Sequence, residues 1–420
     1  MGTRLLAALT SYREVIRSPR SFPLWLGQLV SSFGDTLHYV ALVVLVFQLS
    51  GEGLAVAGLV AVEIVPVLVL GPVAGVVIDR FGRKGILVAS DLVRAALALS
   101  LVWPQGVWHA YVVAAGLAAA SVFFNPTVNA VIPALTTTEQ RLAANSVSWS
   151  TGRLVQILAA SIAGGVIAIV GTGPAFALNA ASFVLSAVAI STLRIPAHAG
   201  ELAASTKRGL ASFFGDARAG LDYARRDFFV SRLLVVQSLA SFAVGATGAM
   251  LVVLSQRHLG QPPSGFAWLI AAIGAGALIG PLIPNALARD YRNARWLFVP
   301  YLIRGAGDVL IALFTPLPVA LAILFVYGLN TSTGMVVFSS TIQGAIPESM
   351  RGRVFTLLDV DWSAFRLISL ALGGVIADRL GIEPLFWIGG TLLALAGALG
   401  LALLGNVRFV PESGPDGAAA

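Results

Sequence analysis

Three ionisable residues lie inside long apolar runs that hold no nearby basic residue. Asp35 stands in the run FPLWLGQLVSSFGDTLHYVALVVLVF, His38 follows it by about one helical turn, and Glu63 stands in the next run. A carboxyl group isolated in low-dielectric surroundings is a candidate for proton exchange. We therefore predict Asp35 and Glu63 as proton-coupling residues. His38 is either a relay in the same path or a hydrogen-bonding partner.

Other charges in apolar runs stand in pairs. Asp91 and Arg94 are three residues apart, and Arg304 and Asp308 are four apart. At these spacings two side chains share one face of a helix and can form an ion pair there. Both pairs are predicted to have a structural role rather than a functional one.

A third group of charges is open to two interpretations. Arg153 and Arg366 follow matching Trp-Ser dipeptides in the two halves of the chain, and either could pair with Asp359 or with an anionic substrate. Asp359 and Asp361 lie close to the expected cytoplasmic end of an apolar run. There they could be buried charges or merely interfacial ones.

The stretch GPVAGVVIDRFGRK, residues 71–84, concentrates charge between two apolar runs. Its candidate functional residues are Gly75, Asp79, Arg80, Gly82, Arg83 and Lys84. Glycines permit close helix approach and tight reversal, and basic side chains can hold the loop in the cytoplasm. Asp79 could cap a helix of the other half near residues 351–355 and act as a conformational latch. The alternative is that these charges serve topology alone.

The elements that must position these residues are membrane helices. The chain of 420 residues is 57% hydrophobic, which exceeds the apolar content of soluble proteins. Apolar runs of about 20 residues recur along it, whereas a β-barrel would show shorter alternating segments. The fold class is therefore all-α membrane protein. Twelve spans are expected, near 22–48, 54–78, 86–102, 108–134, 142–170, 174–193, 232–256, 264–288, 296–314, 317–344, 354–377 and 384–406.

These spans divide the chain into two bundles. We expect a cytoplasmic N-terminal segment at 1–21, six-helix bundles at 22–193 and 232–408, a cytoplasmic linker at 194–231 and a disordered tail at 409–420. Within the linker, Leu210, Phe213, Phe214, Ala217, Leu221 and Ala224 fall on one helical face. This pattern predicts an amphipathic helix on the membrane surface, the alternative being an ordinary soluble linker helix.

The distribution of basic residues predicts how the chain is oriented in the membrane. Most of the 27 Lys and Arg residues fall on the side that holds both termini and the linker, and only Arg257 and Arg379 fall on the other. Both termini are therefore predicted to be cytoplasmic, in a multi-pass protein of the inner (plasma) membrane. The net charge of +7 is explained by this orientation and does not argue for nucleic acid.

The two halves repeat each other. Gln28 and Gln237 are separated by the same offset as Gly71-Pro72 and Gly280-Pro281, and as residues 164–168 and 373–377. Six spans per repeat give two parallel repeats, an architecture that binds its substrate near the membrane midplane. The candidate cavity residues are Gln28, Phe33, Trp149, Gln237 and Trp362.

The loop at 75–84 resembles the signature loop of the Major Facilitator Superfamily. The segments Phe33-Gly-Asp35, Leu142-Ala-Ala-Asn145 and Pro347-x-x-x-Arg-Gly-Arg-Val354 are similar to the bacterial macrolide-efflux and enterobactin-exporter branch. The resemblance covers about 20–408 and implies twelve helices in two parallel six-helix repeats. Ala160-Ser161 stands where the antiporter motif of span 5 has Gly-Pro, and span 4 has no Arg. Both departures weaken a strict drug–proton antiport reading.

These observations favour a secondary transporter, driven by protons, that exports an amphipathic small molecule such as a drug, macrolide or siderophore. The alternatives are a lysolipid or other metabolite carrier of the same fold, or a transport-inactive membrane receptor or scaffold. The expected partners are substrate, protons and membrane lipids, with the chain acting as a monomer. No cofactor or metal is expected, since the chain has no Cys and its four His are scattered. Neither an ATP-binding motif nor an enzymatic constellation is found.

Overall fold

The computed structural model describes residues 18, 21–135, 155, 158–160, 162–193, 210–280 and 294–407. Every regular element in these ranges is a helix. The chain divides into two compact units, which are described separately. Unit 1 takes Met1–Phe213 with Gly260–Ala271, and unit 2 takes Phe214–Leu259 with Ala272–Ala420.

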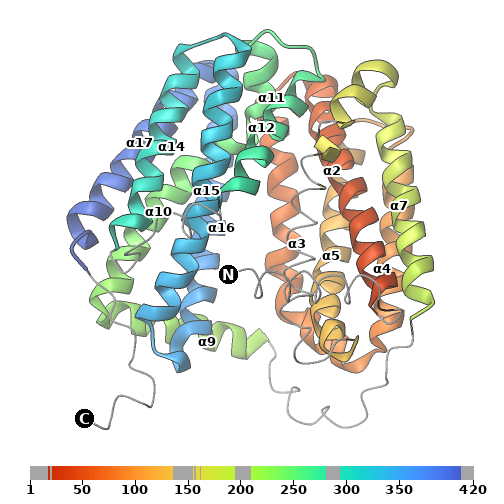
Figure 1. Cartoon of the computed structure of the whole chain (residues 1–420), viewed down its shortest axis with the longest axis horizontal. Helices are drawn as coiled ribbons and strands as arrows, with labels where there is room; N and C mark the ends of the chain where they lie inside the picture. The colour runs from red at the N-terminus through yellow and green to blue at the C-terminus, as the bar shows by residue number, and fades with distance from the viewer. Residues whose placement is uncertain are drawn as a thin grey trace, which may run out of the picture. The chain divides into compact units, whose positions relative to one another are not determined.

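Unit 1 is a bundle of long helices that run side by side (Figure 1). Its helices are α2 (Phe22–Ser50), α3 (Gly53–Arg80), α4 (Arg83–Ser100), α5 (Val107–Leu135) and α7 (Gly173–Ser191). Helix α7 packs against α2 and α4, while α5 packs against α3 and α4. Only Phe81 and Gly82 separate α3 from α4.

Unit 2 is also a helical bundle. Its elements are α9 (Leu210–Arg226), α10 (Phe228–Ala249), α11 (Leu251–Val253), the π-helix η1 (Leu254–His258), α14 (Arg295–Leu313), α15 (Leu317–Ala345), α16 (Glu348–Arg379) and α17 (Ile382–Leu404). Helix α12 (Gly265–Ile279) crosses the division between the units. The core lies where α10 and α14 pack against α17 and α10 packs against α16.

Nine helices in the described part are long and apolar enough to cross a membrane. Most of their ends lie within a few residues of the expected spans. Helix α10 ends at Ala249 rather than near 256, and α11 and η1 continue the chain from there to His258. Helix α16 differs at its start. It begins at Glu348 rather than near 354, because Pro347 starts the helix and its charged first turns precede the apolar run. Helix α4 lies at the expected span 86–102, helical residues 162–170 lie within the expected span 142–170, and the short α12 lies within the expected span 264–288.

The linker helix α9 packs on the N-terminal part of α16. Ala224 is buried, and Tyr223 joins the core of unit 2. A Cβ at Gly220 would lie 2.7 Å from the backbone oxygen of Arg353, so a side chain there would force the helices apart. Asp227, the residue after α9, caps α10 by accepting a hydrogen bond from the backbone N–H of Val230 at 2.8 Å. The side chains at 210–214, on which the membrane-surface prediction depends, lie outside the described part.

Candidate functional site

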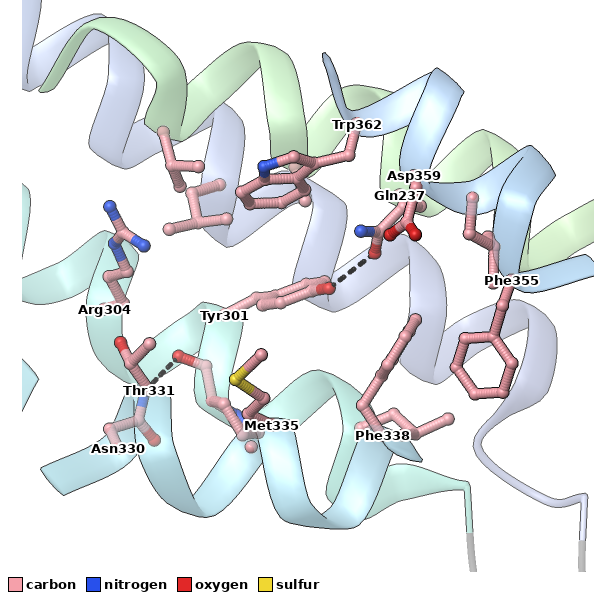
Figure 2. A pocket seen from close by; sticks show the side chains of 17 residues that line it. Gln237, Tyr301, Arg304, Asn330, Thr331, Met335, Phe338, Phe355, Asp359 and Trp362 are labelled. Atoms are coloured by element: carbon pink, nitrogen blue, oxygen red, sulfur yellow. Dashed lines mark hydrogen bonds between the residues drawn. The ribbon is translucent and has the colours of Figure 1, made fainter. Parts of the chain in front are cut away.

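A cavity of about 320 Å³ opens within unit 2, at the lower end of the size range of small-molecule sites. Five helices line it (Figure 2). Its lining residues are Gln237, Ala240 and Val244 from α10; Leu297, Pro300, Tyr301 and Arg304 from α14; Asn330, Thr331, Gly334, Met335 and Phe338 from α15; Phe355, Leu358, Asp359 and Trp362 from α16; and Leu393 from α17.

Two hydrogen bonds fix polar side chains in the wall. The Tyr301 hydroxyl donates to Oε1 of Gln237 at 3.0 Å, which joins α14 to α10. The amide of Asn330 donates to the carbonyl oxygen of Pro300 at 2.6 Å and joins α15 to α14 (Figure 2). Since Pro300 lies inside α14 and lacks an N–H, the helix is locally weakened there, and the Asn330 bond braces it.

Arg304 lies at the end of the cavity near Asn330 and Thr331 (Figure 2). Its guanidinium stacks on the ring of Tyr327, 4.1 Å from the centroid. Its buried Nε has no hydrogen-bond partner among the described residues. Asp308, one turn further along, instead accepts a hydrogen bond from the Thr247 hydroxyl at 3.4 Å. The expected ion pair of Arg304 with Asp308 is therefore replaced by separate partners.

Asp359 and Asp361, two residues apart on α16, point in different directions. Asp359 lies at the opposite end of the cavity from Arg304, beside Gln237 (Figure 2). Asp361 accepts a hydrogen bond from the Ser238 hydroxyl at 2.6 Å and so binds α16 to α10. Two residues on a helix turn a side chain through about 200°. Only Asp359 therefore belongs to the cavity.

Unit 1 holds a buried ion pair. Asp91 and Arg94 are both buried and bond to each other along α4, as the spacing predicted. The Arg94 guanidinium lies 4.0 Å from the ring centroid of Phe124 and 4.4 Å from that of Phe183. The pair is thus enclosed by aromatic rings within the bundle.

The predicted proton-coupling residues all lie in unit 1. Asp35 is exposed at the surface of α2, near the Asn179 amide and within electrostatic reach of Arg94. His38 is buried, and neither ring nitrogen has a hydrogen-bond partner in the described ranges. The ring instead contacts Phe176 edge-on, with centroids 5.0 Å apart. Glu63 is partly buried on α3. The coupling role of all three stays a prediction.

Among the described side chains of the charged loop, Arg83 forms a hydrogen bond to another helix of unit 1. Arg83, at the start of α4, donates to the carbonyl oxygen of Ala130 near the end of α5 at 3.1 Å. Arg80 and Lys84 are exposed. A Cβ at Gly75 would meet no atom within 4 Å, and Gly82 has φ −60°, which any residue adopts. Neither close approach at Gly75 nor a special backbone conformation at Gly82 is seen among the described residues of the unit, and the roles of both glycines stay predictions. The Asp79 side chain lies outside the described part, and its latch role stays a prediction.

Of the predicted cavity residues, Gln237 and Trp362 line the cavity together. Gln28 and Phe33 lie on α2 in unit 1, and Trp149 lies outside the described residues, as does Arg153. Arg366 lies on α16, and the cavity lining does not include it. The sequence analysis did not single out Tyr301, Asn330, Thr331, Met335 or Phe355. The polar run Asn330-Thr331-Ser332-Thr333 in an apolar helix was the available signal.

The residue types that line the cavity suit an organic molecule. Among the described residues no group of His, Cys, Asp and Glu is arranged to hold a metal ion. The wall instead combines aromatic rings and Met335 with a few convergent polar groups, an arrangement typical of small-molecule sites. Nearly all of these side chains come from helices that are candidate membrane spans.

Comparisons with known proteins cover almost the whole chain. Residues 16–409 match the family described as transmembrane secretion effector. The chain is 28% identical to the uncharacterized MFS-type transporter YfiS of Bacillus subtilis (89% of this chain, 91% of that protein). It is 24% identical to macrolide efflux protein A of Streptococcus pyogenes (89% and 93%). It is 27% identical to the multidrug efflux pump Tap of Mycolicibacterium fortuitum (91% and 94%).

Solved structures agree on the fold. A bacterial homologue of the human lysosomal transporter Spinster superimposes with a TM-score of 0.70 at 13% identity, over 93% of this chain and 99% of that one. The nucleoside transporter NupG superimposes with a TM-score of 0.68 at 13% identity, over 90% of this chain and 98% of that one.

Proposed function

Because the chain belongs to the transmembrane secretion effector family of the Major Facilitator Superfamily, we propose that it is a proton-driven exporter of amphipathic small molecules that works by alternating access. In this proposal twelve helices form two parallel repeats in the plasma membrane, with both termini cytoplasmic. The protein acts as a monomer, and lipids and protons are its other partners.

The cavity of unit 2 is the observation that carries the proposal. Charged and amide side chains are costly inside a membrane bundle, and they are retained there chiefly along a substrate or ion path. Arg304, Asp359, Gln237 and Asn330 converge on a space that is otherwise lined by aromatic and aliphatic groups. Such a wall suits an amphipathic molecule better than a sugar or an inorganic ion.

The packing within each unit supports the repeat. In unit 1, α7 packs on α2 and α4, and α4 packs on α5. In unit 2, α17 packs on α10 and α14, and α14 packs on α15. These helices hold equivalent places in the two expected sets of six spans. The shared pairing is what two copies of one bundle would show.

Proton coupling is assigned to Asp35. The residue is exposed on α2, while its carboxyl lies near the buried Asn179 amide and within electrostatic reach of Arg94. A carboxyl between an accessible surface and a buried cation can gain and lose a proton as the access changes.

A transport assay in proteoliposomes tests the proposal. A panel of lipophilic drugs and metabolites is offered to the purified protein with an imposed pH gradient. At least one compound should move uphill, and a proton ionophore should stop it. Asp35→Asn should lose uphill movement and keep downhill exchange, whereas Glu52→Gln, a matched change outside the bundle core, should transport normally. Uphill movement that survives the ionophore would contradict proton coupling.

A further inference from the structure

The cavity of unit 2 carries opposite charges at its two ends. Arg304 lies at one end with Asn330 and Thr331, and Asp359 lies at the other with Gln237 (Figure 2). Tyr301, Trp362 and Met335 lie between them, and Phe338 lies on the Asp359 side (Figure 2). A ligand that fills this space must therefore present an apolar body to the middle and polar groups to both ends.

The Arg304 end lacks an anion. Asp308, the nearest carboxylate on the same helix, is bonded to Thr247 on the side of α10. Tyr327 supports one face of the guanidinium, and the buried Nε–H has no partner in the described part of the chain. A buried guanidinium N–H without a partner is costly, and an oxygen acceptor on a ligand would satisfy it.

The Asp359 end lacks a cation. Among the described residues no ion pair or hydrogen bond includes the Asp359 carboxylate, and the residue is exposed on α16 within the candidate span Met350–Arg379. The neighbouring Gln237 already has its amide oxygen bonded to Tyr301. The carboxylate is therefore the strongest free acceptor at this end, and a protonated amine is its natural partner.

From this geometry we propose that the cavity selects an amphipathic amine: a protonated nitrogen at Asp359, an apolar body along Trp362 and Phe338, and a carbonyl or sulfonyl oxygen at Arg304. The inference rests on the proposed function only in taking the cavity as the substrate site. It assigns Asp359 and Arg304 as the residues that determine substrate specificity.

The test uses two matched fluorescent probes. Dansylcadaverine has a primary amine, an apolar chain and an aromatic sulfonamide, and its N-acetyl derivative carries a neutral amide in place of the charged amine. Binding is measured on the full chain in lipid nanodiscs, with the signal of empty nanodiscs subtracted. The wild-type protein should bind the amine about ten- to a hundredfold more tightly than the acetyl derivative, the range expected for one charge-assisted hydrogen bond.

The variants separate the two ends. Asp359→Asn should bring the affinity for the amine down to that for the acetyl derivative. Arg304→Gln should weaken both probes by a similar factor and leave their ratio unchanged. Asp361→Asn is the matched control, since its side chain bonds Ser238 outside the cavity, and it should keep the wild-type ratio.

Each contrary result is distinct. Equal affinities in the wild type, or a preserved ratio in Asp359→Asn, would overturn the amine site. Unchanged binding of both probes by Arg304→Gln would overturn the acceptor site. A chain that exports lipophilic compounds without preferring the amine would contradict this inference alone. Amine preference without uphill transport would contradict the proposed export alone.

Discussion

Helices α4 and α14 each carry an arginine that stacks on an aromatic ring, yet the two arginines have different electrostatic partners. In unit 1, Arg94 bonds directly to Asp91 on its own helix, and Phe124 and Phe183 flank it. In unit 2, Arg304 lines the cavity, while Asp308 on the same helix bonds to Thr247 of α10.

The difference shows that the sequence spacing of an aspartate and an arginine on one helix does not alone decide whether the two form an ion pair. Both pairs have a spacing that allows contact along one helix. In unit 1 two aromatic rings flank Arg94 inside the bundle, so the buried guanidinium is stabilised by pairing with Asp91 on the same helix. In unit 2, Thr247 offers Asp308 a hydroxyl and Tyr327 supports Arg304, so the arginine stays available to a ligand.

The largest expected effect follows from breaking the closed pair. Arg94→Gln leaves the buried Asp91 carboxylate without its cation, and removing one partner of a buried pair lowers the free energy of unfolding by about 3–5 kcal/mol. Arg304→Gln removes an arginine that has no such partner and should lower it by less than about 1 kcal/mol. Thermal unfolding of the purified proteins, followed by Trp fluorescence, measures both.

A double variant controls for the packing of Arg94. Asp91→Asn combined with Arg94→Gln removes both charges, and it should recover part of the stability that Arg94→Gln loses. If Arg94→Gln and Arg304→Gln unfold at the same temperature, then the ion pair with Asp91 does not make Arg94 more important for stability than Arg304.

The next effect concerns how tightly α14 is held beside Arg304. A Cβ at Gly305 would lie 2.5 Å from the carbonyl oxygen of Gly390, so α14 and α17 touch through their backbones. Gly305→Ala should lower the free energy of unfolding by about 1–3 kcal/mol through overpacking. Gly75→Ala, where a Cβ would meet nothing within 4 Å, is the matched control and should unfold like the wild type. Equal losses in both would show that the contact of α14 with α17 does not control the result, since alanine has a higher helix propensity than glycine.

The sequence predicted the spans well because membrane helices need only length and apolarity. The ends of α2, α5 and α17 follow directly from these two properties. It also predicted the Asp91–Arg94 pair, since both residues share one helix.

What the sequence did not predict depends on neighbours from distant helices. Asp359 and Asp361 looked alike as near-interfacial charges, and only the position of Ser238 on α10 separates them. The cavity role of Tyr301 depends in the same way on Gln237, which stands 64 residues earlier in the chain. Hydrophobic patterning says little about which face of an all-apolar helix meets which partner.

The smallest expected effect comes from a variant in which Arg304 would pair with Asp308, as Arg94 pairs with Asp91. Thr247 is buried, and its γ-methyl group packs against Gly389, so Thr247→Val keeps the shape and removes only the hydroxyl. The bond to Asp308 is long, at 3.4 Å, and its loss should lower the free energy of unfolding by about 1 kcal/mol or less. Asp308 then has Arg304 as its best remaining partner within electrostatic reach. The two should pair, and binding of both dansyl probes should weaken as it does in Arg304→Gln. Thr247→Ser keeps the hydroxyl and should retain the affinity of the wild type. If Thr247→Val binds the probes as tightly as the wild type, then Thr247 does not hold the two charges apart.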